Sequence, residues 1–195
     1  MCRTGCRAQA PAMHRHLTSS PAPEPIAVVV RTMADRLAYA ALLEQQRRWL
    51  EGALGAPIHV LQPGAAAEYA DPFAAYDEDG TTAFLARRGG RPVGTAALTP
   101  VGGEPGTVEL TRVFVAARAR GSGVGAALVA AVVEEARGAG AERIALETHE
   151  PTMGAAVRMY RRAGFRDRDP LGPVTHPGVL ALELDLVGAA EPLPA

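Results

Sequence analysis

The sequence predicts an α/β fold in which helices flank both faces of a mixed central β-sheet. Along the 195 residues, hydrophobic periodicity switches several times between the two-residue repeat of a strand and the 3.6-residue repeat of a helix. Hydrophobic residues make up 48% of the chain and charged residues 21%, which is the composition of a globular protein. This length suits one domain. We expect it at residues 26–187, between a disordered N-terminal tail at 1–25 and a frayed C-terminus at 188–195.

The N-terminal half begins with a strand and a long helix. A β-branched run at 26–30 follows a proline and predicts a strand that is buried on both faces. Leucines recur at helical spacing over 34–54, and Gly55 supplies a stop signal, so we expect one long helix there. Residues 56–80 are rich in turn signals and predict only short helical turns, which could line a substrate cleft.

The centre of the chain predicts a hairpin and a further strand. Strand-like runs at 81–87 and 91–99 are joined by Gly89-Gly90, a pair suited to a type I′ or II′ turn. The alternation of a strand returns at 108–115.

The C-terminal half alternates between helices and strands. Apolar positions predict a helix from 124 to about 138, a strand at 144–147 and a last strand at 179–186. Between these strands, Gly164 and Phe165 match the two positions that follow a helix in a Schellman cap. The apolar face of the helix that they end consists of Met153, Ala156, Val157 and Tyr160.

Charge and cysteine content argue against several classes of function. The formal net charge is −1 and all 20 basic residues are Arg, so no basic excess points to nucleic acid. No run approaches the roughly 18 apolar residues of a membrane-spanning helix, and we expect a soluble protein. Cys2 and Cys6 lie near His14 and His16, but their spacing differs from the usual zinc finger and we expect no metal. Without other cysteines, the chain fits a reducing cytoplasm.

A glycine-rich loop at 120–125 carries the main functional signal. It leads into the helix at 124–138, whose first N–H groups lack helical partners and form the positive end of the helix dipole. Such an end binds a phosphate or pyrophosphate, and the guanidinium of Arg120 can add a forked contact to the phosphate oxygens.

Two other interpretations of this loop stay open. Alternating glycines also occur in ordinary tight turns. The pattern Gly121-x-Gly123-x-x-Ala126 satisfies the dinucleotide fingerprint, with Glu147 placed as a ribose-binding acid. Against this nicotinamide-dependent oxidoreductase, residues 116–120 separate the loop from its strand, and too little chain follows to complete a nucleotide-binding sheet.

Four segments follow one another in a set order along the chain. They are Glu-Leu-Thr-Arg-Val-Phe-Val at 109–115, the Arg/Gly loop, Leu-Glu-Thr at 146–148, and a stretch at 155–165 that contains Tyr160 and Gly164-Phe165. In order and spacing they resemble the core of the GNAT superfamily of N-acetyltransferases. A weaker likeness extends over most of the chain outside the N-terminal tail.

The resemblance implies a coenzyme A site on a splayed pair of parallel strands, here 108–115 and 144–147. In this family the Arg/Gly loop binds the pyrophosphate through backbone amides, and the pantetheine arm lies between the two strands. Main-chain groups of Phe114 and Val115 would bind the arm and polarise the thioester carbonyl. The residues implied for coenzyme binding are Phe114, Val115, Arg120, Gly121, Ser122, Gly123, Val124, Gly125, Ala126 and Thr148.

The resemblance also implies an enzyme that moves an acetyl group from acetyl-CoA to an amine by direct attack in a ternary complex. Tyr160 matches the family's proton donor to the departing sulfur, because a phenol with a pKa of about 10 stays protonated at neutral pH. A core aromatic is the alternative interpretation of Tyr160. Glu109 stands where relatives often place the base that deprotonates the amine, and His149 and Glu150 are alternatives.

Some features stay open. Met153 stands where the family often has Asn, and Ala117 where it often has Pro.

A non-catalytic acyl-CoA sensor on the same fold is the second hypothesis. The acceptor amine is not specified, because residues 56–80 and the loop around His176 carry little pattern. A homodimer is compatible with the family.

Overall fold

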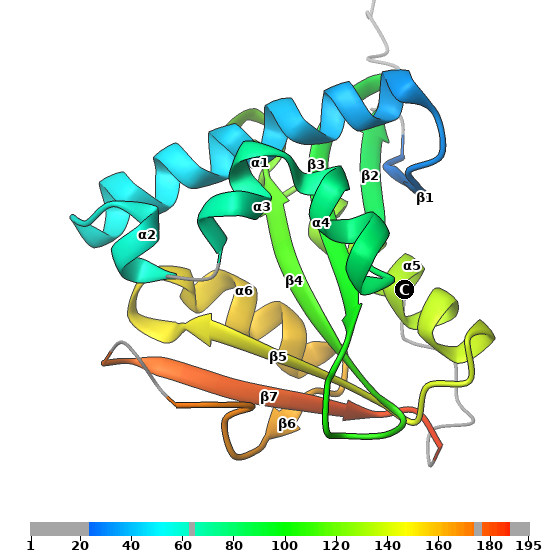
Figure 1. Ribbon diagram of the computed structural model, residues 1–195. Coiled ribbons are helices and arrows are strands. Elements are labelled where there is room, and N and C mark those ends of the chain that lie inside the picture. Colours follow the sequence, from blue (N-terminus) through cyan, green and yellow to red (C-terminus); the bar gives the residue numbers. More distant parts are fainter. Residues whose placement is uncertain (1–23, 63–64, 174–176, 188–195) are drawn as a thin grey trace, which may run out of the picture.

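The computed structural model describes residues 24–62, 65–173 and 177–187, which form a mixed sheet with helices on both faces (Figure 1). The strands run in the order β1-β2-β3-β4-β5-β7-β6, and β4 and β5 are the one parallel pair among the described strands. The predicted fold class is confirmed. The expected end at 188–195 and all but two residues of the expected tail at 1–25 lie outside the described residues, as do the candidate zinc ligands and His176.

The strands are β1 (Ile26–Val29), β2 (Thr82–Arg88), β3 (Arg91–Pro100), β4 (Thr107–Val115), β5 (Arg143–His149), β6 (Arg166–Asp167) and β7 (Val179–Asp185). The helices are α1 (Met33–Leu54), α2 (Ile58–Leu61), α3 (Ala66–Ala70), α4 (Pro72–Asp79), α5 (Val124–Gly138) and α6 (Glu150–Arg162). A 3₁₀ turn, Ala117–Ala119, lies between β4 and α5.

Each face of the sheet has its own hydrophobic core. On one face, Tyr39 and Leu43 of α1 pack with Tyr76 of α4 against Leu85 and Phe114 of the sheet. On the other face, α5 and α6 cover the sheet with side chains that include Leu128, Val132 and Tyr160. Figure 1 shows α1 on one side of the strands and α5 on the other. The sheet is therefore buried between helices on both sides, as the alternating periodicity predicted.

Helix α1 has a capping motif at its start and a glycine stop at its end. Thr32 accepts a hydrogen bond from Asp35 N–H through its side chain, while the Asp35 carboxylate accepts one from Thr32 N–H, which makes a capping box. Gly55 ends the helix in the left-handed region with φ 72°. The predicted helix and its glycine stop are confirmed.

The hairpin is also confirmed, because Gly89 and Gly90 have φ values of 56° and 76°, the pair of positive angles that a type I′ turn requires. Between α1 and this hairpin, the described residues form the short helices α2, α3 and α4, as expected.

Strand β1 differs from its prediction. It pairs only with β2 and lies at the edge of the sheet, where Ile26 is 66% exposed and Val28 is 41% exposed. The expectation of burial on both faces was wrong, because a β-branched run is equally compatible with an edge strand whose outer face has no covering helix.

The end of α6 forms the predicted Schellman cap. Gly164 has φ 95°, its N–H donates to Arg161 O at 3.1 Å, and Phe165 N–H donates to Tyr160 O at 3.0 Å. The rings of Tyr160 and Phe165 lie 5.6 Å apart between centroids and supply the hydrophobic contact that accompanies this motif. The cap therefore fixes the place of Tyr160 on the sheet.

Strands β4 and β5 pair and then separate. Their parallel register runs only from Thr107 opposite Arg143 to Glu109 opposite Ala145, although both strands continue well beyond these residues. Figure 1 shows the two strands diverging from that end. The splayed parallel pair that the family resemblance implied is therefore present.

A bulge bends β4 beside this separation. Arg112 and Val113 together oppose Ala96 of β3, and Arg112 has φ 54°, a left-handed value that is uncommon for residues other than glycine. Thr95 Oγ1 donates to Arg112 O at 3.0 Å and holds the bulge. The bulge turns β4 away from β5 and opens the site described next.

Candidate functional site

A cleft of about 210 Å³ occupies the gap where β4 and β5 separate. Helices α1 and α2 supply one wall, and α6 contributes Met153 and Tyr160. The lining residues are Gln46, Leu50, Leu54, Ile58, Leu61, Gln62, Glu109, Leu110, Thr111, Arg112, Val113, Glu147, Thr148, His149, Met153, Tyr160 and Val179. The structure thus brings together Tyr160, Glu109 and Thr148, which the sequence had placed on three different elements.

Glu109 lies at the last paired position of β4, where the gap begins. Burial raises the pKa of its carboxyl group, the charge of Glu147 raises it further, and the charge of Arg112 opposes both. A carboxylate with a raised pKa in a cleft is a better proton acceptor than an ordinary surface carboxylate.

The two alternative bases are less suitable. His149 Nε2 lies 3.0 Å from Pro177 O, and because a carbonyl only accepts, Nε2 carries the proton and donates. The other ring nitrogen, Nδ1, lies 2.7 Å from Thr152 Oγ1, so both ring nitrogens already have hydrogen-bond partners. Glu150 is exposed at the start of α6 and is not among the residues that line the cleft.

Tyr160 belongs both to the core and to the cleft. It is 5% exposed, packs against Phe165, and also lines the gap between β4 and β5. Burial raises the pKa of its phenol, so the hydroxyl stays protonated over the whole neutral range. The interpretations of Tyr160 as a core aromatic and as a proton donor are therefore compatible. The ring can pack in the core while the hydroxyl acts in the cleft.

The glycine-rich loop presents the start of α5 without a side-chain cap from any described residue. Gly121 and Gly123 have φ values of 73° and 82°, which a residue with a side chain rarely adopts. A Cβ at Gly125 would lie 2.7 Å from Met159 Sδ, so Gly125 leaves room for that methionine side chain between α5 and α6. Ser122 donates from Oγ to Ala119 O at 2.7 Å and holds the loop. Open amides at an uncapped helix start fit a diphosphate.

Arg120 lies at the same end of β4. Its Nε donates to Val115 O at 3.2 Å, and its guanidinium carbon lies 5.1 Å from the centre of the Trp49 ring. The side chain therefore rests on β4 and α1 rather than over the start of α5.

Along β4, the main-chain N–H and C=O groups of successive residues point alternately toward β3 and toward the gap. Ala116 N–H donates to Val93 O at 2.9 Å, which makes that pair a bonded rung of the β3–β4 ladder. Because rungs alternate along antiparallel strands, the groups of Phe114 point toward β3 and those of Val115 point away from β3, toward the gap. Val115, rather than Phe114, thus offers a main-chain N–H to a ligand between the strands.

The cleft contains a charged network that the sequence did not reveal. The Arg112 guanidinium makes a two-pronged ion pair with the Glu68 carboxylate of α3 and donates to Gln62 Oε1 at 3.1 Å. Glu68 also accepts from the Tyr76 hydroxyl, which lies 3.0 Å from that of Tyr39. Residues 56–80 have no periodicity that could have predicted this pairing with the bulge of β4.

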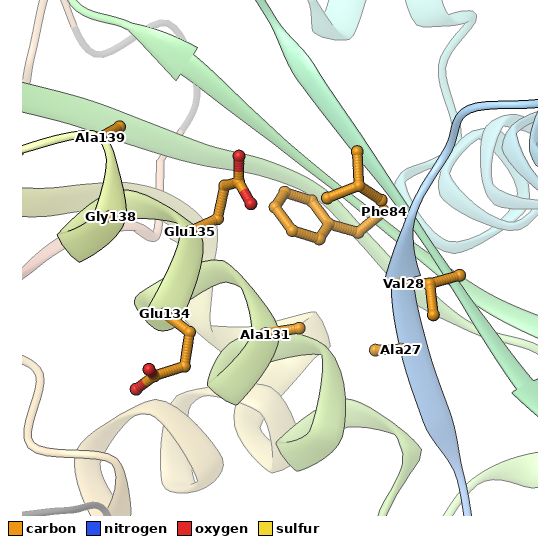
Figure 2. Close-up of a pocket in the computed structure, with 9 residues that line it drawn as sticks. Ala27, Val28, Phe84, Ala131, Glu134, Glu135, Gly138 and Ala139 are labelled. Atoms are coloured by element: carbon orange, nitrogen blue, oxygen red, sulfur yellow. The ribbon is translucent and has the colours of Figure 1, made fainter.

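The second hollow lies elsewhere, between β1 and the outer half of α5 (Figure 2). Its volume is about 590 Å³, larger than that of the cleft, but no predicted catalytic or coenzyme-binding residue lines it. Figure 2 shows Phe84 and the carboxylates of Glu134 and Glu135 around it. The predicted catalytic residues Glu109 and Tyr160 line the smaller cleft instead.

The dinucleotide interpretation is wrong. A Rossmann sheet is mostly parallel, whereas β4 and β5 are the one parallel pair among the described strands. Glu147 accepts a hydrogen bond from Leu171 N–H at 3.0 Å, and it lines the cleft between β4 and β5 rather than a site at the glycine-rich loop.

Within 24–62, 65–173 and 177–187, no group of three or more His, Cys, Asp and Glu could hold a metal ion. Over the same ranges, no helix combines the length and the apolar character that crossing a membrane requires.

Comparison with known proteins points to one family. The profile of the acetyltransferase (GNAT) family matches residues 43–165. The chain is 39% identical over 90 residues to an "IAA acetyltransferase" of Azospirillum brasilense, a match that covers 46% of this chain and 58% of that relative. It is 30% identical over 120 residues to an uncharacterized N-acetyltransferase of Schizosaccharomyces pombe, covering 61% of this chain and 72% of that relative.

The same architecture occurs in solved structures. The crystal structure of ribosomal-protein-alanine N-acetyltransferase from Brucella melitensis superposes with a TM-score of 0.61 at 23% sequence identity, covering 83% of this chain and 99% of that one. At this identity the likeness shows the fold alone.

Proposed function

Since the chain belongs to the acetyltransferase (GNAT) family, we propose that it transfers the acetyl group of acetyl-CoA to an amine in a ternary complex. The observation that supports this most is one continuous arrangement. An uncapped helix start with open amides lies at the end of β4, and the gap beside β4 leads from there to Glu109 and Tyr160. A phosphate-bearing carrier bound at α5 would reach the cleft through this gap.

Each residue then has one task. The amides at the start of α5 hold the diphosphate. The N–H of Val115 binds the pantetheine arm between β4 and β5. At the end of the arm, the gap between the strands excludes water from the thioester. Glu109 accepts a proton from the amine, whose nitrogen forms a bond to the carbonyl carbon. The carbon–sulfur bond breaks, and Tyr160 gives its proton to the leaving thiolate, so charge and protons balance.

Ligand-induced stabilisation tests the coenzyme assignment. Acetyl-CoA at a hundredfold excess over its dissociation constant should raise the free energy of unfolding by about 2.7 kcal/mol, whereas NADH should have no effect. Thermal melts of the full chain with each ligand would measure the difference. Stabilisation by NADH but not by acetyl-CoA would contradict the proposal.

A further inference from the structure

Gln46 of α1 contains a buried acceptor that the fold leaves unpaired. The residue is 7% exposed and lines the cleft, and its Oε1 has no hydrogen-bond partner among the described residues. An unsatisfied buried acceptor costs roughly 1–3 kcal/mol, and Gln46, unlike the equally unpartnered Tyr69 hydroxyl, lines the cleft, where a bound ligand could supply the missing donor. A half-turn of the carboxamide about its terminal bond exchanges Oε1 with Nε2, so either end of the amide can be presented to a ligand in the cleft.

The uncompensated charge of the cleft is negative. Glu109 and Glu147 both line it, and neither forms an ion pair with any described residue. The cation of the cleft, Arg112, is neutralised by Glu68, with only 13% of its side chain exposed. Both ring nitrogens of His149 are already hydrogen-bonded, to Thr152 and Pro177. Among the described residues, the cleft therefore offers carboxylates to a cationic group and no unpaired cation to a carboxylate.

The remaining wall is apolar and the space is small. Leu50, Leu54, Ile58 and Leu61 line the side of the cleft formed by α1 and α2. A volume of about 210 Å³ holds a small molecule or a single side chain rather than a folded surface.

We propose that the acceptor is a small cationic amine with an apolar body and no carboxylate. Its ammonium group binds near Glu109 and Glu147 and donates a hydrogen bond to the Gln46 carboxamide, while its body packs on the apolar wall. Glu109 takes one proton from the ammonium group, which frees the neutral amine for attack; the second proton, lost as the amide forms, replaces the one that Tyr160 gives to the thiolate. Glu147 rejects amino acids, because their carboxylate would face its charge across the cleft. This inference rests on the proposed acetyl transfer and adds the substrate class to it.

Pairs of substrates that differ only in a carboxylate test the expected rejection of amino acids. Phenethylamine and phenylalanine differ only in a carboxylate, as do tryptamine and tryptophan. With acetyl-CoA and the full chain, kcat/KM should be at least ~10-fold higher for each amine than for its amino acid, since like charges in one site disfavour binding. Glu147→Gln should narrow this ratio by raising the kcat/KM of the amino acids. Glu134→Gln, on the distant outer face of α5, should leave the ratio unchanged.

Gln46→Met tests the carboxamide, because methionine keeps the length of the side chain and removes its hydrogen bonds. The KM for the amine should rise by ~5- to 10-fold while the KM for acetyl-CoA stays constant. The melting temperature should not fall, since an unsatisfied buried acceptor has been removed; a merely structural Gln46 would show the reverse pattern.

The outcomes separate the inference from the proposed function. Equal turnover of amines and amino acids, or an unchanged amine KM in Gln46→Met, would overturn the inference and leave acetyl transfer intact. Stabilisation by acetyl-CoA without turnover of either amine would also overturn it. If acetyl-CoA fails to stabilise the folded protein, the proposed function itself fails and the inference with it.

Discussion

Replacing Tyr160 by Phe should lower kcat by roughly 100-fold or more while leaving the melting temperature almost unchanged. The ring packs against Phe165 and closes the Schellman cap of α6, and both contacts survive the loss of the hydroxyl. Only the proton donor to the leaving thiolate is removed. Burial raises the pKa of this phenol above its ordinary value, so Tyr160 is protonated at neutral pH. Steady-state thiol release with saturating acetyl-CoA would measure the loss.

Tyr69→Phe is the matched control. Its hydroxyl is buried without a hydrogen-bond partner among the described residues, so removing it should leave kcat unchanged. If Tyr160→Phe kept full activity, Tyr160 would be a core aromatic alone. If instead the unmodified protein bound acetyl-CoA tightly but acetylated no amine, the acyl-CoA sensor would replace the enzyme as the better hypothesis.

Replacing Glu109 by Gln should reduce kcat/KM by roughly 100- to 10,000-fold at neutral pH, the range for removal of a general base. Glutamine has nearly the same size, so the last rung between β4 and β5 should persist and acetyl-CoA should still bind. Glu134→Gln, on the outer face of α5, is again the control. Unchanged activity of Glu109→Gln would assign the base elsewhere.

The pH dependence of kcat/KM tests the same role of Glu109. Glu109 accepts a proton only when ionised, so activity should fall as the pH falls through its pKa. Burial and the charge of Glu147 raise that pKa, which places the acid limb of kcat/KM above the ordinary glutamate value of about 4.3. In Glu147→Gln the limb should move to lower pH, because the charge of Glu147, one of the causes that raise the pKa of Glu109, is gone. A limb that did not move would show that Glu109 is not the titrating base.

Local signals in the sequence predicted most of the fold. Gly55, Gly89-Gly90 and Gly164-Phe165 each need a specific backbone conformation that depends on a few neighbouring residues, and each occurs as expected. The edge position of β1 could not be predicted in this way. It depends on which strands pair far along the chain, and a short β-branched run is the same in either place.

The candidate site was predictable in part for the same reason. Glu109 and Tyr160 follow from ordered motifs, and the separation of β4 and β5 brings them to one cleft. Gln46 reaches that cleft from α1, and Glu68 of α3 pairs with the cleft residue Arg112, through contacts that no spacing encodes. The bulge at Arg112 is equally hidden, because its left-handed φ has no glycine to mark it.

The central claim is that main-chain amides at the start of α5 bind the diphosphate of an acyl carrier. The most direct measurement is calorimetric titration of the folded protein with acetyl-CoA and with S-acetylpantetheine, which has the same thioester arm but lacks the diphosphate together with the 3′-phosphoadenosine attached to it. Acetyl-CoA should bind saturably, and S-acetylpantetheine should bind about 100-fold more weakly, because charge-assisted hydrogen bonds contribute roughly 1.5–3 kcal/mol each. Equal affinity for the two ligands, or no heat with acetyl-CoA, would contradict the account.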